Sequence, residues 1–373
     1  MGVALLPVTT EARYRGDIAG WAPWFASEEG IERVIDNVDE LDILYLFVYE
    51  IDDDGELVSR VDLNDGVWED LIDEARDERV DIIPTIAWFD GEAIHEMLSD
   101  EDRRAEHIEA IVEMVDDGRY DGVNIDYEQK LATTIDYFSD FLEELEDELG
   151  RDDLTCTIEA RMRPEHRWRP DQLPDQIAYA NDYKAMNRHC DWVEIMAYDQ
   201  QRADIVMNNT RRGVPYSPVA DIDWVEHVIE FALEDIDEDK IFLGVPTYGR
   251  AWDVTVASEW YRDYQSVASL NQPRILELSE KYDAPIGRTA GGEAVISYFP
   301  DTSPYRLLEQ LPVPEGTPKG YEAAAIALMV ATLADVEIPV RFVSWSDARA
   351  IADKLDIAEQ YDLRGIALFK LDG

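Results

Sequence analysis

Basic residues are scarce in this chain of 373 residues, which has 33 Lys and Arg against 83 Asp and Glu and a net charge of −50. Only seven of the basic residues are Lys. Such a chain repels phosphate backbones and anionic membrane surfaces, so we expect no nucleic-acid partner. The acids are spread over most predicted helices rather than gathered in one tail. We therefore favour a surface adapted to molar salt, where charge repulsion is screened, over a Ca²⁺ store or an acidic interaction surface.

Cysteine, histidine and long apolar runs are scarce as well. Cys156 and Cys190 are too few for a disulfide framework, and we expect each to be a small buried side chain beside a strand. The five His are scattered without zinc spacing, so we expect no metal and no cofactor. The longest apolar run, residues 323–334, is too short to span a bilayer. Residues 1–6 lack the features of a secretory signal, which leaves a cytoplasmic protein or one whose signal lies outside this sequence.

The aromatic and apolar content is that of a folded protein. Hydrophobic residues make up 46% of the chain, with ten Trp and eighteen Tyr, which excludes disorder as the main state. Eight short apolar runs alternate with acidic segments of helical spacing, a pattern typical of βαβ units around a parallel sheet. Eight such units predict a (β/α)₈ barrel. The predicted strands are 18–25, 43–51, 80–89, 122–127, 154–160, 192–198, 241–248 and 365–371.

One interval is too long for a simple connection between strands. About ninety residues separate Trp252 from Phe342, and within them 290–299 predicts a turn and a strand and 321–336 an apolar helix. We expect a small α+β subdomain at 253–341, inserted between strands seven and eight of a barrel formed by 17–252 and 342–373. The acidic segment 52–55 resembles a fragment of a Ca²⁺ loop, but the later ligands are missing, so we interpret it as a hairpin turn.

Polar side chains appear at the end of the fourth predicted strand. Alternation along a strand places Asn124, Asp126 and Glu128 on one face. Inside a barrel these groups would be costly to bury without partners, but at the carboxyl end of the strand they reach the mouth, where barrel enzymes have their active sites. The alternatives are a solvated strand edge or a buried hydrogen-bond network.

The segment from Asp121 to Glu128 resembles the signature of the family 18 glycoside hydrolases, the chitinase-like enzymes, which reads Asp-Gly-x-x-x-Asp-x-Glu. Asn124 departs from the Asp usual at the fourth place. Segments 192–199, 241–250, 346–354 and 365–371 resemble the later strands and the last helix entry of that family, so the resemblance covers about residues 17–373. Residues 198–200, 218–220 and 224–226 are similar to the subgroup that trims spore-cortex and cell-wall sugars, although no wall-binding LysM repeat is present.

The resemblance implies a retaining mechanism in which the acetamide of the substrate is the nucleophile. Glu128 would be the general acid and base, and Asp126 would orient the acetamide and remain ionised. Tyr198 would donate a hydrogen bond to the acetamide oxygen, and Asn124 would hydrogen-bond to Asp126 from below. The substrate would be β-1,4-linked N-acetylglucosamine in a chitin-like or cell-wall glycan, and we expect a monomer.

Aromatic residues near the strand ends predict a sugar platform, because pyranose faces stack on such rings. We expect Trp24 to lie in the barrel core instead. The family usually has a Trp at the end of strand eight, where this chain has Phe369. Asp199 and Arg250 are expected either beside the site or as an ordinary ion pair at its rim. The predicted substrate-binding residues are Trp21, Trp88, Met196, Asp199, Tyr248, Arg250 and Phe369.

Two other functions stay open. The barrel could be a non-catalytic carbohydrate-binding or inhibitor protein, which Asn124 and Phe369 favour slightly, whereas the retained acid Glu128 favours an enzyme. The acidic surface could instead serve an interaction partner, but that partner would have to be basic and bind despite high salt.

Overall fold

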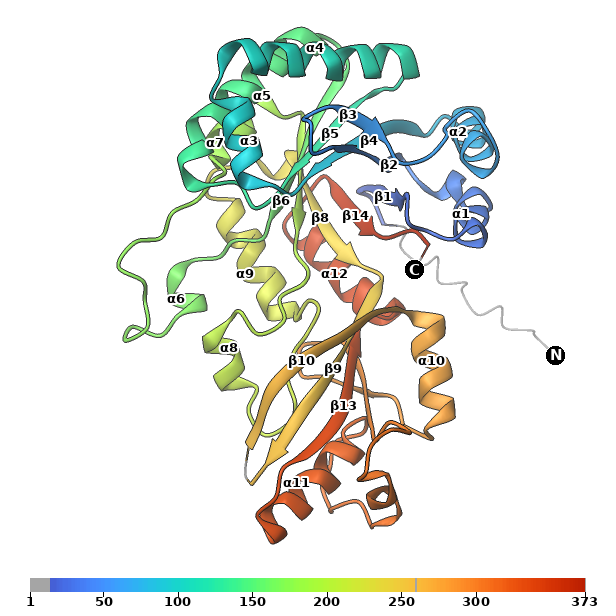
Figure 1. Cartoon of the computed structure of the whole chain (residues 1–373), viewed down its shortest axis with the longest axis vertical. Coiled ribbons are helices and arrows are strands. Elements are labelled where there is room, and N and C mark those ends of the chain that lie inside the picture. Colours follow the sequence, from blue (N-terminus) through green and yellow to red (C-terminus); the bar gives the residue numbers. More distant parts are fainter. Residues whose placement is uncertain (1–13, 259, 373) are drawn as a thin grey trace, which may run out of the picture.

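The computed structural model describes residues 14–258 and 260–372, so the expectation for residues 1–6 lies outside the described part. Eight parallel strands form a closed barrel, since β1 pairs with both β14 and β2 (Figure 1). All eight predicted strands are confirmed, and the chain is a (β/α)₈ barrel. The barrel strands are β1 Asp17–Pro23, β2 Ile43–Ile51, β4 Asp81–Trp88, β5 Gly122–Tyr127, β6 Asp153–Glu159, β7 Trp192–Met196, β8 Ile241–Pro246 and β14 Gly365–Phe369.

Helices surround the barrel because most of them carry one apolar face, whereas the short α6 buries no side chain. In α5, Phe138, Phe141 and Leu145 are buried against the strands, while the intervening acids face outward. The helices of this part are α1 Glu28–Ile35, α2 Val67–Glu78, α3 Gly91–Leu98, α4 Glu101–Gly118, α5 Ile135–Leu149, α6 Pro164–Arg167, α7 Tyr183–His189, α8 Ile205–Thr210, α9 Ile222–Ala232 and α12 Ala348–Gln360. None of the described helices combines the length and the apolar composition that a bilayer crossing needs.

The barrel strands divide their side chains between two cores by simple alternation. On β2, Tyr45 and Phe47 point into the barrel, whereas Leu44 and Leu46 face the helices. The acidic segment 52–55 is the turn of an antiparallel hairpin in which Ile51 of β2 pairs with residue 57 of β3 (Leu57–Ser59). In residues 14–258 and 260–372, no cluster of three or more potential ligands could hold a metal ion.

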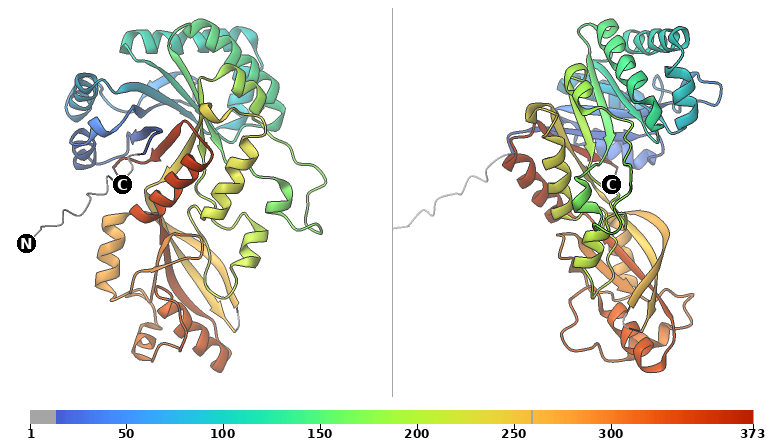
Figure 2. Two further views of the ribbon diagram at one scale, coloured as in Figure 1. Left: turned by 180° about the vertical axis from the view of Figure 1, so that it is seen from behind. Right: turned by 90° about the vertical axis from the view of Figure 1, so that its left-hand side faces the viewer.

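A second sheet of five strands lies beside the carboxyl end of the barrel (Figures 1 and 2). Its order is β10-β9-β13-β12-β11, and α11 packs on it through a separate apolar core. The predicted strand at 290–299 and helix at 321–336 correspond to β12 and α11. The sheet also includes residues 248–252 and 342–345, because β9 follows β8 after a single residue and pairs with β13 along its length. The elements are β9 Tyr248–Ala257, β10 Trp260–Asn271, α10 Gln272–Lys281, β11 Gly287–Arg288, β12 Ala294–Tyr298, α11 Glu322–Ala334 and β13 Ile338–Trp345.

The two cysteines are buried as expected, but the expectation that each is a separate small side chain is wrong. Cys156 of β6 and Cys190, which follows α7, are both buried and form a disulfide with their Cα atoms 6.2 Å apart. The sequence separation of 34 residues concealed this contact, because it is the parallel pairing of β6 with β7, in which Cys156 lies opposite Val193, that brings Cys190 close to Cys156.

Candidate active site

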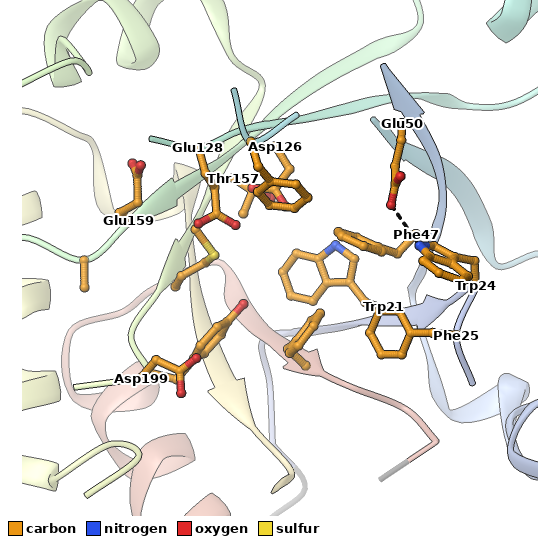
Figure 3. Close-up of a pocket in the computed structure, with 15 residues that line it drawn as sticks. Trp21, Trp24, Phe25, Phe47, Glu50, Asp126, Glu128, Thr157, Glu159 and Asp199 are labelled. Carbon is orange, nitrogen blue, oxygen red and sulfur yellow. Dashed lines mark hydrogen bonds between the residues drawn. The ribbon is translucent and has the colours of Figure 1, made fainter. Parts of the chain in front are cut away.

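A cavity of about 460 Å³ opens at the carboxyl ends of the barrel strands. It has an acidic side with Asp126, Glu128 and Asp199, and an aromatic side around Trp21 and Trp24 (Figure 3). Its size and its mainly apolar lining suit a small organic ligand held by a few polar groups. The lining residues are Trp21, Trp24, Phe25, Phe47, Glu50, Phe89, Asp126, Glu128, Thr157, Glu159, Ala160, Met196, Tyr198, Asp199 and Phe369.

Alternation along β5 explains how acids come to line this cavity. Val123, Ile125 and Tyr127 belong to the core between strands and helices, so Asn124 and Asp126 project into the barrel. The backbone N–H of Glu128 donates to the carbonyl oxygen of residue 88 at 2.8 Å, which extends the pairing with β4 by one residue. Glu128 therefore stands above Asp126 at the mouth.

Burial and like charges hold a proton on this carboxylate pair. Burial, then the charges of Glu159 and Asp199, raise the pKa of Glu128 to about 7, against the lowering effect of Lys130. Burial and the neighbouring Glu128 raise the pKa of Asp126 well above its usual value. At neutral pH the pair can therefore keep a proton that an exposed carboxylate would have lost.

Two expectations about Asp126 differ from the structure. Asn124 makes no hydrogen bond to Asp126, because its Nδ2 donates to Thr155 at 2.7 Å and to Glu194 at 3.0 Å, and its Oδ1 accepts from Thr157. The buried Oδ1 of Asp126 has no partner among the described residues. A carboxylate that is buried with so little hydrogen bonding favours its protonated form in the free protein, whereas our expectation was that Asp126 stays ionised throughout turnover.

The aromatic floor of the cavity is built around Phe369. Tyr198 stacks on this ring with centroids 5.6 Å apart, and Trp21 meets its edge at 6.0 Å. Tyr248 contacts both Tyr198 and Phe369 but does not line the cavity. Of the predicted residues, Trp21, Met196, Tyr198, Asp199 and Phe369 thus come together at the cavity, and Tyr248 supports them from behind.

Two of the predicted tryptophan positions are wrong. Trp88 does not line the cavity, since alternation on β4 turns it outward, where it packs against Tyr127 and His107. The next residue, Phe89, lines the cavity in its place. Trp24, expected in the core, is 38% exposed at the rim and donates its Nε1 hydrogen to Glu50 at 3.0 Å.

Arg250 reaches the site from the second sheet. It lies on β9 and holds Asp199 through two hydrogen bonds, one of them 2.9 Å from Nε to Oδ1. Asp199 has a φ of +54°, a conformation that Asp tolerates better than most residues. Arg250 therefore acts on the cavity by orienting Asp199, and it does not line the cavity itself.

Sequence reasoning missed Glu159, Thr157 and Glu194. Glu159 lines the cavity from the end of β6 and is held by the backbone N–H of Gln129 at 3.2 Å and by Asn181 at 2.9 Å. Glu194 lies below the cavity on β7 and is fully buried. An acid inside the apolar run 192–196 was a signal that could have drawn attention to Glu194.

Comparisons with known proteins agree with this geometry. A carboxylate pair that holds a proton at a barrel mouth, above an aromatic floor, suits a glycoside hydrolase. The family model for "Glycosyl hydrolases family 18" matches residues 21–373, and the chain belongs to that family. The chain is 28% identical over 250 residues to YdhD of Bacillus subtilis, described as a sporulation-specific glycosylase, a match that covers 66% of this chain and 53% of YdhD.

Solved structures of low sequence identity share the fold. The class V chitinase of Pseudomonas fluorescens Pf-5 has a TM-score of 0.72 at 18% identity, covering 96% of each chain. The spore cortex-lytic enzyme SleL of Bacillus cereus has a TM-score of 0.69 at 17% identity, covering 95% of this chain and 71% of SleL. The matched part of this chain spans only about half the length of the curated relatives.

Proposed function

We propose that this chain is a retaining glycosidase that hydrolyses β-1,4-linked N-acetylglucosamine in chitin-like or cell-wall glycans, using the acetamide of the substrate as the nucleophile. It acts as a monomer and needs no metal or cofactor. The observation that carries the proposal is the Asp126–Glu128 pair at the barrel mouth, with a pKa of about 7 for Glu128.

The reaction has two steps. Glu128 donates its proton to the glycosidic oxygen while the acetamide oxygen attacks the anomeric carbon, and the aglycone leaves. Glu128, now a carboxylate, then takes a proton from a water molecule that opens the oxazolinium ring with net retention. Tyr198 donates a hydrogen bond to the acetamide oxygen. The acetamide N–H supplies the donor that Asp126 lacks in the free protein, so in the complex Asp126 is the ionised partner of protonated Glu128, accepts that hydrogen bond and balances the positive charge of the intermediate.

The cavity supports a sugar as the ligand. Trp21, Tyr198 and Phe369 offer ring faces and edges to an apolar pyranose face, while the acids gather on one side. The names of two relatives, a chitinase and a spore cortex-lytic enzyme, support the choice of glycan class.

The test is hydrolysis of fluorogenic N-acetylglucosamine di- and trisaccharides in molar salt by the parent and by Glu128→Gln. Loss of a general acid costs about 10²–10⁴-fold in rate, so the variant should lose at least a hundredfold in kcat/KM. Gln is nearly isosteric with Glu, so oligosaccharide affinity should stay within a few-fold of the parent. Binding without turnover by the parent would instead establish a non-catalytic carbohydrate-binding protein, and the absence of binding would refute the substrate class.

A further inference from the structure

A third acid is buried beneath the carboxylate pair. Glu194 of β7 is 0% exposed and lies two residues before Met196, which lines the cavity. Its Oε1 accepts a hydrogen bond from the hydroxyl of Tyr45, and its Oε2 accepts from Nδ2 of Asn124 at 3.0 Å. Trp192 donates its Nε1 hydrogen to the same Tyr45 oxygen at 3.0 Å, so the hydroxyl hydrogen of Tyr45 is free for Glu194.

This environment dictates the orientation of Asn124. Its amide nitrogen faces Glu194 and Thr155, both of which accept from it, so its carbonyl Oδ1 must face the other way. There Oδ1 accepts the hydroxyl hydrogen of Thr157 at 3.0 Å. The reverse orientation would break the two hydrogen bonds that Nδ2 donates and the one that Oδ1 accepts from Thr157.

Thr157 links Asn124 to the position of Asp126. The register between β5 and β6 pairs Asn124 with Thr155 and Ile125 with Cys156, so Thr157 is level with Asp126, and both line the cavity (Figure 3). A threonine hydroxyl has one hydrogen to donate, and that of Thr157 is given to Asn124. Thr157 therefore donates nothing to Asp126, whose buried Oδ1 has no donor among the described residues.

We propose that Glu194 is a positioning residue that works through Asn124 and Thr157 to withhold a hydrogen bond from Asp126, so that the carboxylate pair keeps its catalytic proton. Glu194 and Asn124 form an acid–amide pair in which each residue requires the other. A carboxylate at position 124 would face a second buried carboxylate, whereas the amide gives Glu194 a donor. The inference rests on the proposed function for its kinetic readout.

The surrounding charges agree with this role. Burial raises the pKa of Glu194 to about 8, although hydrogen bonds from Tyr45 and Asn124 lower it, so near pH 7 Glu194 is mostly uncharged and acts on the pair through its hydrogen bond to Asn124. Where Glu194 is ionised at higher pH, its charge is also one of those that raise the pKa of Asp126. The titratable groups that face the catalytic pair are Lys130 from the adjoining loop, Glu159 from β6, and Glu194, Tyr198 and Asp199 from β7 and its end.

The test compares the parent with Glu194→Gln, Asn124→Asp and the exchange variant that carries both substitutions. Each is assayed for kcat/KM from pH 4 to 10 and for unfolding in urea, in the same molar salt. The glutamine introduced by Glu194→Gln can donate to the amide oxygen of Asn124 and turn that amide, which frees Thr157 to donate to Asp126. The pH at which kcat/KM falls on the alkaline side should therefore be lower in Glu194→Gln than in the parent, by about half a pH unit or more.

Asn124→Asp should lose at least tenfold in kcat/KM, because it places two buried carboxyl groups in contact. The exchange variant should recover at least tenfold over Asn124→Asp, since its amide at position 194 then donates to its carboxylate at position 124, and the cycle is non-additive. Glu293→Gln is the matched control. Glu293 is equally buried but accepts from the backbone N–H groups of Val219 and Ala220 beside the second sheet. The Glu293→Gln variant should therefore lose kcat/KM at the same alkaline pH as the parent.

An unchanged alkaline limb in Glu194→Gln, or additive effects in the exchange variant, would overturn the inference. If the parent hydrolyses no substrate, the proposed function fails by itself. The double-mutant cycle of unfolding free energies in urea then tests the acid–amide pair, because non-additive values support the pair and additive values overturn it.

Discussion

The pH dependence of Glu128 gives the sharpest prediction. Glu128 is the acid in the first step, so activity requires its protonated form, which is present below its folded pKa and lost as the pH rises through it. With a pKa of about 7, half of the molecules hold the proton at pH 7 and about a tenth at pH 8. The kcat/KM of the parent should therefore fall tenfold for each pH unit above the pKa of Glu128, which gives an alkaline limb in the pH profile.

Glu159→Gln should move this limb. Among the charges that raise the pKa of Glu128, that of Glu159 is the largest, but burial contributes more and is unchanged by the substitution. The limb should therefore move down by about half to one pH unit and stay well above the usual value for Glu. At pH 7 the protonated fraction would fall from about one half to between about a tenth and a quarter, with a matching loss in kcat/KM.

The assay is kcat/KM for the fluorogenic disaccharide from pH 4 to 10 in molar salt. Glu50→Gln is the control, because Glu50 also lines the cavity but is bonded to Trp24 and Arg60 on the opposite side. It should keep the limb of the parent even if KM changes. The reasoning would be refuted if Glu159→Gln kept the limb of the parent, or if Glu50→Gln moved it equally.

Three further predictions concern the surroundings of the site. Replacing Cys156 and Cys190 by Ala should lower the free energy of unfolding by about 4 kcal/mol in urea, because their 34-residue separation sets the loop entropy; an unchanged midpoint would contradict this. Trp24→Ala should raise KM for the trisaccharide about tenfold, through the loss of a stacking surface, while kcat stays near that of the parent. Arg250→Lys keeps the charge but loses the two-point contact with Asp199, so kcat/KM should fall about tenfold at nearly unchanged stability; equal activity would show that Asp199 needs no such support.

The alternation of side chains along a strand gave the correct positions on β5, and the error at Trp88 arose because the same rule was not applied to β4. The period of two along β5 correctly placed Asn124 and Asp126 inside the barrel. The same rule applied to β4 turns Trp88 outward and Phe89 toward the cavity, as the structure shows. Proximity to a strand end was therefore a weaker guide than strand parity.

Contacts between distant strands could not be predicted from the sequence. The hydrogen bond from Asn124 to Glu194 joins residues 70 positions apart, and that from Tyr45 to Glu194 joins residues 149 apart. Their existence depends on the register of the strands and on closure of the barrel, neither of which leaves a local pattern. The disulfide between Cys156 and Cys190 has the same origin.

Local periodicity was enough to define the eight strands and their alternation with helices, together with the strand and the helix now seen as β12 and α11, and the resemblance supplied the residues of the family signature. Which acids meet, and how they titrate, depends on the folded barrel instead. The pKa of about 7 for Glu128 and of about 8 for Glu194 arises from burial and from neighbours on other strands. Burial and through-space charge are properties of the closed barrel, since an isolated strand would leave each of these carboxylates in water.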